Sequence, residues 1–466
     1  MNRLLYFLSL ILVVSVSVSC EKILEFEPEG SNIEEDEALS TKAGVEALLN
    51  SGYEALAGYM GGSFQAFGDL MADDLVKPAS NNDLDEVYRH NVLFFNSTVG
   101  NTYAAPYASV FRANRVLDVV DGFDFSEIES NRIKGECLFL RAFAHFEVVK
   151  LFAHTYGYSP NNDHPGIVIK SSTERQLLPR SSVNEVYMFI IQDLKDAANL
   201  LPPSNGIYAT SDAAKALLAK VYFQMGDYAN AAQVAGEVIN SGSYSLGASV
   251  DRYLSNNVAP EVIFWLDSYL DVNGGTAFFA SGNFTGNYRY SQSNLNPVLK
   301  PTRVFYDAYA GDTTDKRLDF FEIINAGEPD EILVCRKFDR DYFNVPLLHL
   351  TDLKLLRAEA LAELGQDLAT AIDDVNDIRE RAYGSPGKNL GAGVSAAAII
   401  EAARYERRIE MFGEGDRFDQ LKRRGALENE NIEVRGDVWN CNGMILQFPI
   451  SENTELFEMN PTGGCN

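Results

Sequence analysis

Aromatic side chains stand beside amides, carboxylates and arginines in two stretches of this 466-residue chain. Sugar binding needs flat apolar surfaces for the C–H faces of the ring and planar polar groups for its hydroxyls, and this mixture supplies both. Aromatic residues in long loops usually serve as local core, so both interpretations stay open for each side chain. The candidate ligand contacts are Phe284, Asn287, Tyr288, Arg289 and Tyr290 in one stretch, which runs from Phe278-Phe279 to Gln292, and Phe67, Asp69, Asp73 and Asn82 in the other.

Paired carboxylates could support a second kind of chemistry, the hydrolysis of glycosidic bonds. Asp73 with Asp74, and Glu406 with Glu410, are nominal pairs for a glycoside hydrolase, whose retaining form needs two carboxyl groups roughly 5 Å apart in a cleft. Arginines alternate with Glu406 and Glu410 along the chain, so a helical salt-bridge network is the simpler interpretation. We therefore predict no catalytic residue and no enzymatic activity.

Metal and cofactor sites are not indicated. The five histidines have no metal-ligand spacing and no CxxC motif is present, which argues against a zinc site. The run Asn81–Glu86 offers oxygens of the kind that coordinate Ca²⁺, but it lacks the spacing and the glycine of a calcium loop. A solvated loop is the favoured interpretation, with a structural calcium ion as the alternative, and no other cofactor is predicted.

The first residues have the layout of a cleaved secretory signal. Arg3 precedes the apolar stretch Leu4–Val14, which is too short to span a bilayer comfortably, and small residues lead up to Cys20. We predict a signal peptide at 1–19 and acyl chains, palmitate among them, on Cys20, followed by an acidic tether at 20–36. Ser17 stands where Leu is usual, and an ordinary signal that leaves Cys20 as a free thiol is the alternative.

The net charge argues against one class of function, and three of the remaining cysteines have predicted structural roles. The formal net charge is −27 at pH 7, which repels phosphate backbones and argues against nucleic-acid binding. Cys441 and Cys465 both lie in the C-terminal tail and can form one disulfide. Cys137 falls within an apolar helical run and is expected to be buried.

Helical periodicity dominates the rest of the chain, and 46% of the residues are hydrophobic, enough for a large core. Pro106 would fall in the first turn of the second predicted helix, and Ser182 with Glu185 would form a capping box on the fourth. The third helix is apolar on two sides and must pack on two sides, as in a layered helical stack. The four helices are predicted at Thr41–Leu56, Tyr103–Val120, Asn131–Ala153 and Ser182–Leu200.

Two further helix pairs share a pattern. One pair, 211–224 and 228–240, turns near Gly226, and the other, 348–364 and 368–382, turns at Gly365. Small residues at matching distances from each hinge let helices approach closely, as in the tetratricopeptide repeat. An unrelated αα-hairpin is the alternative.

Two regions interrupt the helical pattern. Residues 241–346 are rich in Gly, Asn, Ser and aromatics, with short strands predicted at Val262–Leu266 and Ile332–Phe338 and no helical period over Gly282–Pro297. Residues 58–97 form the second irregular region. Loops on a rigid helical frame are the expected place for function.

Eight stretches, in the same order over nearly the whole chain, resemble the SusD/RagB family of surface lipoproteins from Bacteroidetes-type bacteria. The tail MNPTGGCN departs from the family's usual ending, and no ligand contact of the family aligns with a motif here. The stretches are CEKILEFEP, ALLNSGYEAL, YAAPYASVFRANRVLD, GECLFLRAFAHFEVVKLFA, RSSVNEVYMFIIQDLKDAANLLP, LLRAEALAELG, ERRIEMFGEGDRFDQLKRRG and FPISENTELFEMNP.

The resemblance implies a mostly α, SusD-like fold, in which a tetratricopeptide-like frame of helical repeats carries long irregular ligand-binding loops and a few short strands. It implies a single domain over 37–466, made of an N-terminal helical half (37–240), a loop-rich segment (241–346) and a C-terminal half (347–466). It further implies a lipid-anchored protein on the extracellular face of the outer membrane, which captures oligosaccharides and delivers them to a SusC-like TonB-dependent transporter. Peptide binding, as in RagB-like members, is the alternative, ahead of a surface glycoside hydrolase.

Overall fold

The computed structural model describes residues 39–78, 81–270, 277–291 and 295–465. The predictions for the signal peptide, Cys20, the tether and Gln292 lie outside these residues. The described residues divide at Val45 into two units, and every described strand belongs to the second. None of the described helices combines the length and the apolar character needed to cross a membrane.

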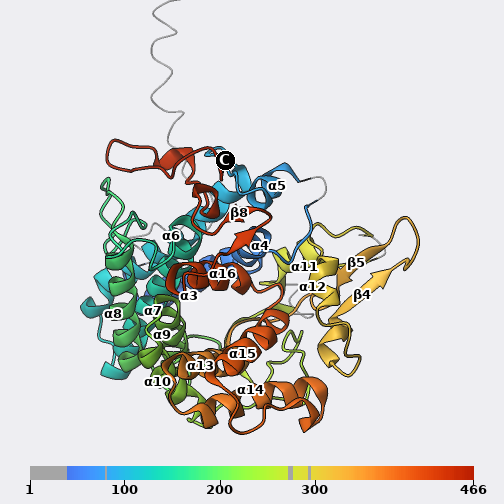
Figure 1. The fold of residues 1–466 in the computed structure, drawn as a ribbon. Helices are drawn as coiled ribbons and strands as arrows, with labels where there is room; N and C mark the ends of the chain where they lie inside the picture. The colour runs from blue at the N-terminus through green and yellow to red at the C-terminus, as the bar shows by residue number, and fades with distance from the viewer. Residues whose placement is uncertain (1–38, 79–80, 271–276, 292–294, 466) are drawn as a thin grey trace, which may run out of the picture. The chain divides into compact units, whose positions relative to one another are not determined.

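A stack of consecutive helices forms the frame (Figure 1). Each of its members packs on the next along the chain. The third predicted helix, α7, lies between α6 and α8 and buries side chains all around its axis, which confirms its two-sided packing. The members are α6 (Ser97–Val119), α7 (Glu127–Phe152), α8 (Val183–Leu200), α9 (Ser211–Met225) and α10 (Tyr228–Ile239), preceded by α3 (Lys42–Met60).

Side-chain caps set where these helices begin. Ser182 accepts a hydrogen bond from the backbone N–H of Glu185, whose carboxylate accepts one in return, so the predicted capping box on α8 is confirmed. The predicted start of α6 was wrong. Asn96 caps that helix by accepting from the N–H of Val99 at 3.0 Å, so Pro106 lies inside it rather than in its first turn. This start was missed because the first turn of α6 is polar and shows no apolar periodicity.

Both predicted helix pairs are present and adjoin each other. α9 and α10 turn at Gly226, and α13 (Leu350–Leu364) and α14 (Leu368–Tyr383) turn at Gly365; these glycines adopt left-handed φ values of 76° and 62°. α13 packs against α10 across the long sequence gap that separates the pairs. Two later helices complete the frame: α15 (Ala396–Glu410) packs on α13 and α14, and α16 (Asp416–Leu427) packs on α9 and α4.

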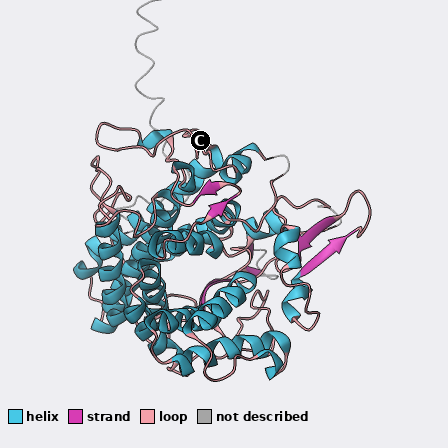
Figure 2. Ribbon diagram, in the orientation of Figure 1, coloured by secondary structure: helices cyan, strands magenta, loops and turns pink. Residues whose placement is uncertain are grey.

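Residues 240–344 leave the frame after α10 and return to it before α13; we call this segment the excursion. A strand within it, β1 (Val262–Leu266), pairs antiparallel with β6 (Val345–His349), which directly follows the excursion. The prediction of β1 is confirmed residue for residue, whereas Val345–His349 was partly assigned to the following helix. Every described sheet has two strands (Figure 2). The others are β2 (Tyr269–Leu270) with β3 (Ala277–Phe278), β4 (Phe321–Ile324) with β5 (Ile332–Cys335), and β7 (Glu433–Val434) with β8 (Asp437–Val438).

Short helices occupy segments that we predicted to be irregular. A helix of seven or nine residues spans about two turns, too few for a hydrophobic period to stand out. Gly282–Pro297 was expected to lack helix, yet it begins with α11. The short α-helices are α4 (Ser63–Met71), α5 (Asn82–Tyr88), α11 (Gly282–Tyr288) and α12 (Arg303–Asp307), and the 3₁₀ turns are Val120–Gly122, Lys316–Phe320, Pro386–Lys388, Asn442–Met444 and Ile450–Glu452.

A buried network of arginines and carboxylates joins the excursion to the frame. Glu410 of α15 forms ion pairs with Arg252 and Arg317 of the excursion, at 2.8 and 3.3 Å, and with Arg381 of α14 at 3.0 Å. All four side chains are at most 3% exposed. Burial alone would raise the pKa of the Glu410 carboxyl, but the attraction of the arginines outweighs it and lowers the pKa to about 2.

Glu410→Gln is expected to lower the free energy of unfolding by about 3–5 kcal/mol at pH 7, because three buried arginines then lose a shared counter-charge. Urea-induced unfolding measures the change. Glu401→Gln, on the exposed side of the same helix, is the matched control and should stay within about 0.5 kcal/mol of the parent protein. Equal losses in the two variants would contradict the role assigned to the network.

Candidate functional site

The two aromatic stretches singled out in the sequence meet in space. α11 packs against α4, although more than 200 residues separate them. The amide of Asn283 donates to the hydroxyl of Ser63 at 2.9 Å, and the hydroxyl of Tyr288 donates to Asp69 Oδ2 at 2.6 Å. The sequence therefore pointed to one region of the fold through two separate signals.

The interior of this contact is core. Phe284, Tyr288, Phe67 and Asp69 are at most 5% exposed, and the rings of Phe284 and Tyr288 lie 4.8 and 5.0 Å from that of Phe338. The expectation that these four side chains contact a ligand is corrected by their burial. The reason is local: Phe284 and Tyr288 are four residues apart on a helix, so they share one face, and that face packs inward.

Asp69 is held in this core by two donors. Besides the Tyr288 hydroxyl, the backbone N–H of Gly415 donates to Asp69 Oδ1 at 3.1 Å. Burial raises the pKa of the Asp69 carboxyl to about 7, and the two hydrogen bonds work against that rise. Asp69 thus joins α4 to the excursion and to the segment before α16.

The other predicted contacts lie at the edge of this core. Arg289 is partly exposed and forms an ion pair with Asp341 at 2.9 Å, and the ring of Tyr290 lies under the guanidinium of Arg336 at 4.7 Å. Asn287 is also partly exposed. A ligand role for these three residues stays a prediction.

Asp73 and Asn82 lie on the other stretch. Arg417 donates twice to Asp73, both times at 2.8 Å, and although burial opposes it, this pairing lowers the pKa of the Asp73 carboxyl. Asn82 is exposed in the first turn of α5. Asp73 is therefore engaged within the protein, while the side chain of Asn82 faces solvent and keeps its predicted role.

An exposed aromatic surface, which we call the aromatic platform, lies beside these residues and consists of Tyr269, Phe279 and Tyr342. The rings of Phe279 and Tyr342 are nearly parallel, with centroids 5.0 Å apart and an interplanar angle of 16°. Phe279 is 42% exposed and Tyr269 50% exposed, and Tyr269 pairs through β2 with Phe278, next to Phe279. Tyr342 is partly exposed, and because the two stacked rings cover each other's facing sides, it is their outer faces and edges that solvent reaches.

Polar groups border the platform. The hydroxyl of Tyr342 donates to Asn256 Oδ1 at 2.6 Å, and the Arg289–Asp341 ion pair is adjacent to Tyr342 in the chain. Aromatic faces beside amide, carboxylate and guanidinium groups match the chemistry of a sugar ring. Phe279 belonged to the predicted run, but Tyr269 and Tyr342 were missed because no local pattern marks them.

The nominal carboxylate pairs are engaged with arginines. Glu406 pairs with Arg317 and with Arg379, each at 2.7 Å, and it is fully buried. Both carboxylates are thus salt-bridged, as predicted, but their partners are arginines of the excursion and of α14 and not the arginines that alternate with them along α15, which corrects the expectation of a network within one helix. Asp74 is also buried, against the guanidinium of Arg408.

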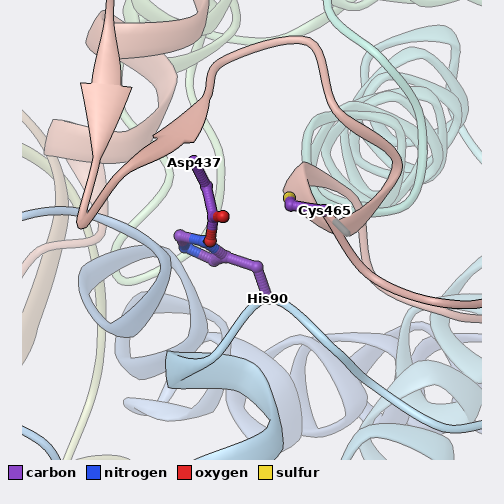
Figure 3. Close-up of side chains that lie close together, drawn as sticks. All are labelled: His90, Asp437 and Cys465. Carbon is purple, nitrogen blue, oxygen red and sulfur yellow. The ribbon is translucent and has the colours of Figure 1, made fainter.

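Two groups of described side chains are close enough to hold a metal ion, and neither fits one. In the first, His90 and Asp437 point toward each other, with Nδ1 and Oδ2 2.7 Å apart (Figure 3). Cys465 Sγ, the third member, is bonded to Cys441 at 2.03 Å and offers no thiolate. The second group consists of Glu359, Glu363 and Glu428, all paired with Arg404.

The run Asn81–Glu86 is a helix start and not a solvated loop, which corrects that expectation. Asn81 caps α5 by accepting from the N–H of Leu84 at 3.1 Å. Asp83 accepts from the hydroxyls of Ser97 and Thr98 at 2.7 and 2.8 Å. These oxygens serve as helix caps, and none of the run's carboxylates belongs to a described group that suits a metal.

Comparison with known proteins gives consistent matches. A SusD-like family model, described as starch-binding and associating with the outer membrane, matches residues 29–223, and the SusD family model matches residues 337–439. The SusD-like proteins P38 and P2 of Formosa agariphila are 25% and 24% identical over 92% and 94% of this chain, and over 93% of each relative.

Solved structures with the same fold are also found. A SusD superfamily protein of Bacteroides thetaiotaomicron superposes with a TM-score of 0.78 at 23% identity, over 90% of this chain and 99% of its own. The surface glycan-binding protein A of Bacteroides fluxus superposes with a TM-score of 0.72 at 21% identity, over the same shares. The mostly α fold with a tetratricopeptide-like frame is thereby confirmed.

Tyr288→Phe is expected to lower the free energy of unfolding by about 1–3 kcal/mol at pH 7, because Asp69 loses a buried donor. The hydroxyl lowers the pKa of Asp69, so its removal raises that pKa further, and the loss should be larger at pH 8 than at pH 6. Urea unfolding at the two pH values tests this. Tyr342→Phe, which removes an exposed hydroxyl, is the control, and a Tyr288→Phe protein as stable as that control would refute the core assignment.

Proposed function

This chain belongs to the SusD/RagB family, and we propose that it is a cell-surface lipoprotein that captures oligosaccharides and delivers them to a SusC-like TonB-dependent transporter of the outer membrane. The acyl chains on Cys20 hold it on the extracellular face. Its ligand is a glycan, and its partner is the transporter that accepts the glycan.

The aromatic platform is the observation that carries the glycan assignment. Phe279 and Tyr342 present nearly parallel rings at the surface, with Asn256, Arg289 and Asp341 at the edge. One sugar face covers about 60 Å² of ring, worth about 1.5 kcal/mol at about 25 cal/mol per Å². Two such contacts, together with a few hydrogen bonds, give a dissociation constant for the glycan in the micromolar to millimolar range.

The surroundings of the carboxylates favour ligand binding without bond cleavage over hydrolysis. A general acid must be ionisable near working pH and must reach the glycosidic oxygen. Glu406 and Glu410 lie in the buried network, and the pKa of Glu410 is held at about 2. The relatives are described as SusD-like proteins, and one structural neighbour as a glycan-binding protein, which supports the same assignment.

Phe279→Ala and Tyr342→Ala should each weaken oligosaccharide binding about tenfold, since each removes about 1.5 kcal/mol of ring contact. Calorimetry against a panel of purified oligosaccharides measures the affinity. Phe111→Ala, which removes an exposed aromatic ring on α6, is the matched control and should bind as the parent does. Binding that persists in both platform variants would refute the platform, and cleavage of the oligosaccharides would refute the proposed function.

Cys20→Ala should move the protein from the membrane fraction to the soluble fraction of the cell envelope, because the thiol that carries the acyl chain is gone. Fractionation followed by immunoblotting shows the distribution. Cys137→Ala, which removes a buried thiol, is the control and should stay with the membrane. Full membrane retention of Cys20→Ala would place the anchor elsewhere.

A further inference from the structure

The basic side chains around the aromatic platform are engaged within the protein. The stretches 265–300 and 336–344, which carry the three platform residues, contain five basic residues, and each of these has an oxygen partner. Ion pairs join Arg289 to Asp341, Arg336 to Glu322 and Asp339, Lys337 to Glu414 and Arg340 to Asp251, while Lys300 donates to Asn296 and to the carbonyl of Pro297. A carboxylate or sulfate group on a ligand would have to compete with these oxygens.

Two carboxylates on the same stretches keep capacity to accept hydrogen bonds. The side chain of Asp341 is 84% exposed, and its ion pair with Arg289 joins one carboxylate oxygen to one guanidinium nitrogen at 2.9 Å. Asp267, two residues before Tyr269, is partly exposed and accepts from the indole N–H of Trp265 at 3.4 Å. Because an ionised carboxylate has about four lone-pair sites, both side chains can accept further donors.

Carboxylates of this kind suit one class of sugar and oppose another. The hydroxyl groups of an uncharged sugar donate to carboxylate oxygens in short, charge-assisted hydrogen bonds. A uronate or a sulfated sugar brings a second negative charge to the same place, and the two charges repel each other. The formal net charge of −27 at pH 7 adds a repulsion of longer range.

The ion pair between Arg289 and Asp341 sets the charge at the edge of the platform. A guanidinium is the side-chain group that best fits a planar carboxylate or a sulfate, so Arg289 alone would attract an acidic sugar. Asp341 compensates that charge, and its side chain is 84% exposed against 35% for Arg289. The partner that solvent reaches more easily is therefore the carboxylate.

We propose that Asp341 makes the platform selective for uncharged oligosaccharides, because its carboxylate accepts the hydroxyl groups of a neutral sugar, compensates Arg289 and repels acidic sugars. Asp267 adds to the repulsion. This inference rests on the proposed function, since it concerns the ligand of the same platform. It names the charge class of the glycan and the residue that determines it.

The test compares one oligosaccharide in two forms. The neutral oligosaccharide that binds most tightly in a panel of neutral, uronate and sulfated oligomers is oxidised selectively at its primary hydroxyls, which become carboxylates on an unchanged backbone. Calorimetry at about 10 mM salt, where charges act over about 30 Å, should give an affinity at least about tenfold lower for the oxidised form. The difference should shrink at about 1 M salt, whereas the loss of a hydroxyl contact would not depend on salt.

Asp341→Asn is expected to produce a gain of binding, which a misfolded protein cannot mimic. The change removes one negative charge and the counter-charge of Arg289, so the affinity for the oxidised oligosaccharide should rise about tenfold at low salt. The affinity for the neutral form should change less than about threefold, because Asn still offers an acceptor to the sugar hydroxyls. Glu401→Gln removes the same charge from an exposed position on α15 and is the matched control, which should bind both forms as the parent does.

The possible outcomes separate this selectivity from the proposed function. Tightest binding to a uronate or sulfated oligomer, equal affinities for the two forms at low salt, or the same affinity for the oxidised form in Asp341→Asn as in the parent would each overturn the role of Asp341 while glycan binding itself stands. Failure of every oligosaccharide in the panel to bind, neutral or acidic, would overturn the proposed function and this inference with it.

Discussion

The rest of the structure depends on the buried network of arginines and carboxylates around Glu410. The excursion packs buried aromatic rings on the helical stack, for example Phe264 on Phe139 of α7, with ring centroids 5.0 Å apart. Arg252 and Arg317 of the excursion also reach α15 and pair there with carboxylates that are almost fully buried. Breaking such a pair leaves an uncompensated buried charge, so the excursion is held in one position.

This anchoring explains how a loop-rich region can present a binding surface. Phe279 and Tyr342 come from different parts of the excursion, yet they stack at 5.0 Å above the core formed by Phe284, Tyr288 and Phe338. A platform that is already assembled loses little conformational entropy when a ligand arrives. The ion pairs thus stabilise the fold and hold in place the rings that the proposed function assigns to the ligand.

Short-range patterns in the sequence predicted the helical frame. The position of the candidate site instead depends on contacts between residues that lie far apart in the chain. The capping box of Ser182 and the strand Val262–Leu266 follow from residues within a few positions of each other, and both are present. The inward turn of Phe284 and Tyr288 depends on α4, far away in the chain, and Tyr342 joins Phe279 only in space. Composition therefore singled out the stretch that contains both Phe279 and the core rings of Phe284 and Tyr288, but it could not separate core rings from surface rings.

The central claim is that a glycan rests on the aromatic platform. Hydroxyl-radical footprinting, with and without the oligosaccharide that binds most tightly, measures it at the level of single side chains. The account predicts that Phe279, Tyr342 and Tyr269 are oxidised in the free protein and protected by the glycan, while Phe284 and Tyr288 stay unreactive in both states. Unchanged oxidation of the platform in the saturated complex, with protection elsewhere, would contradict it.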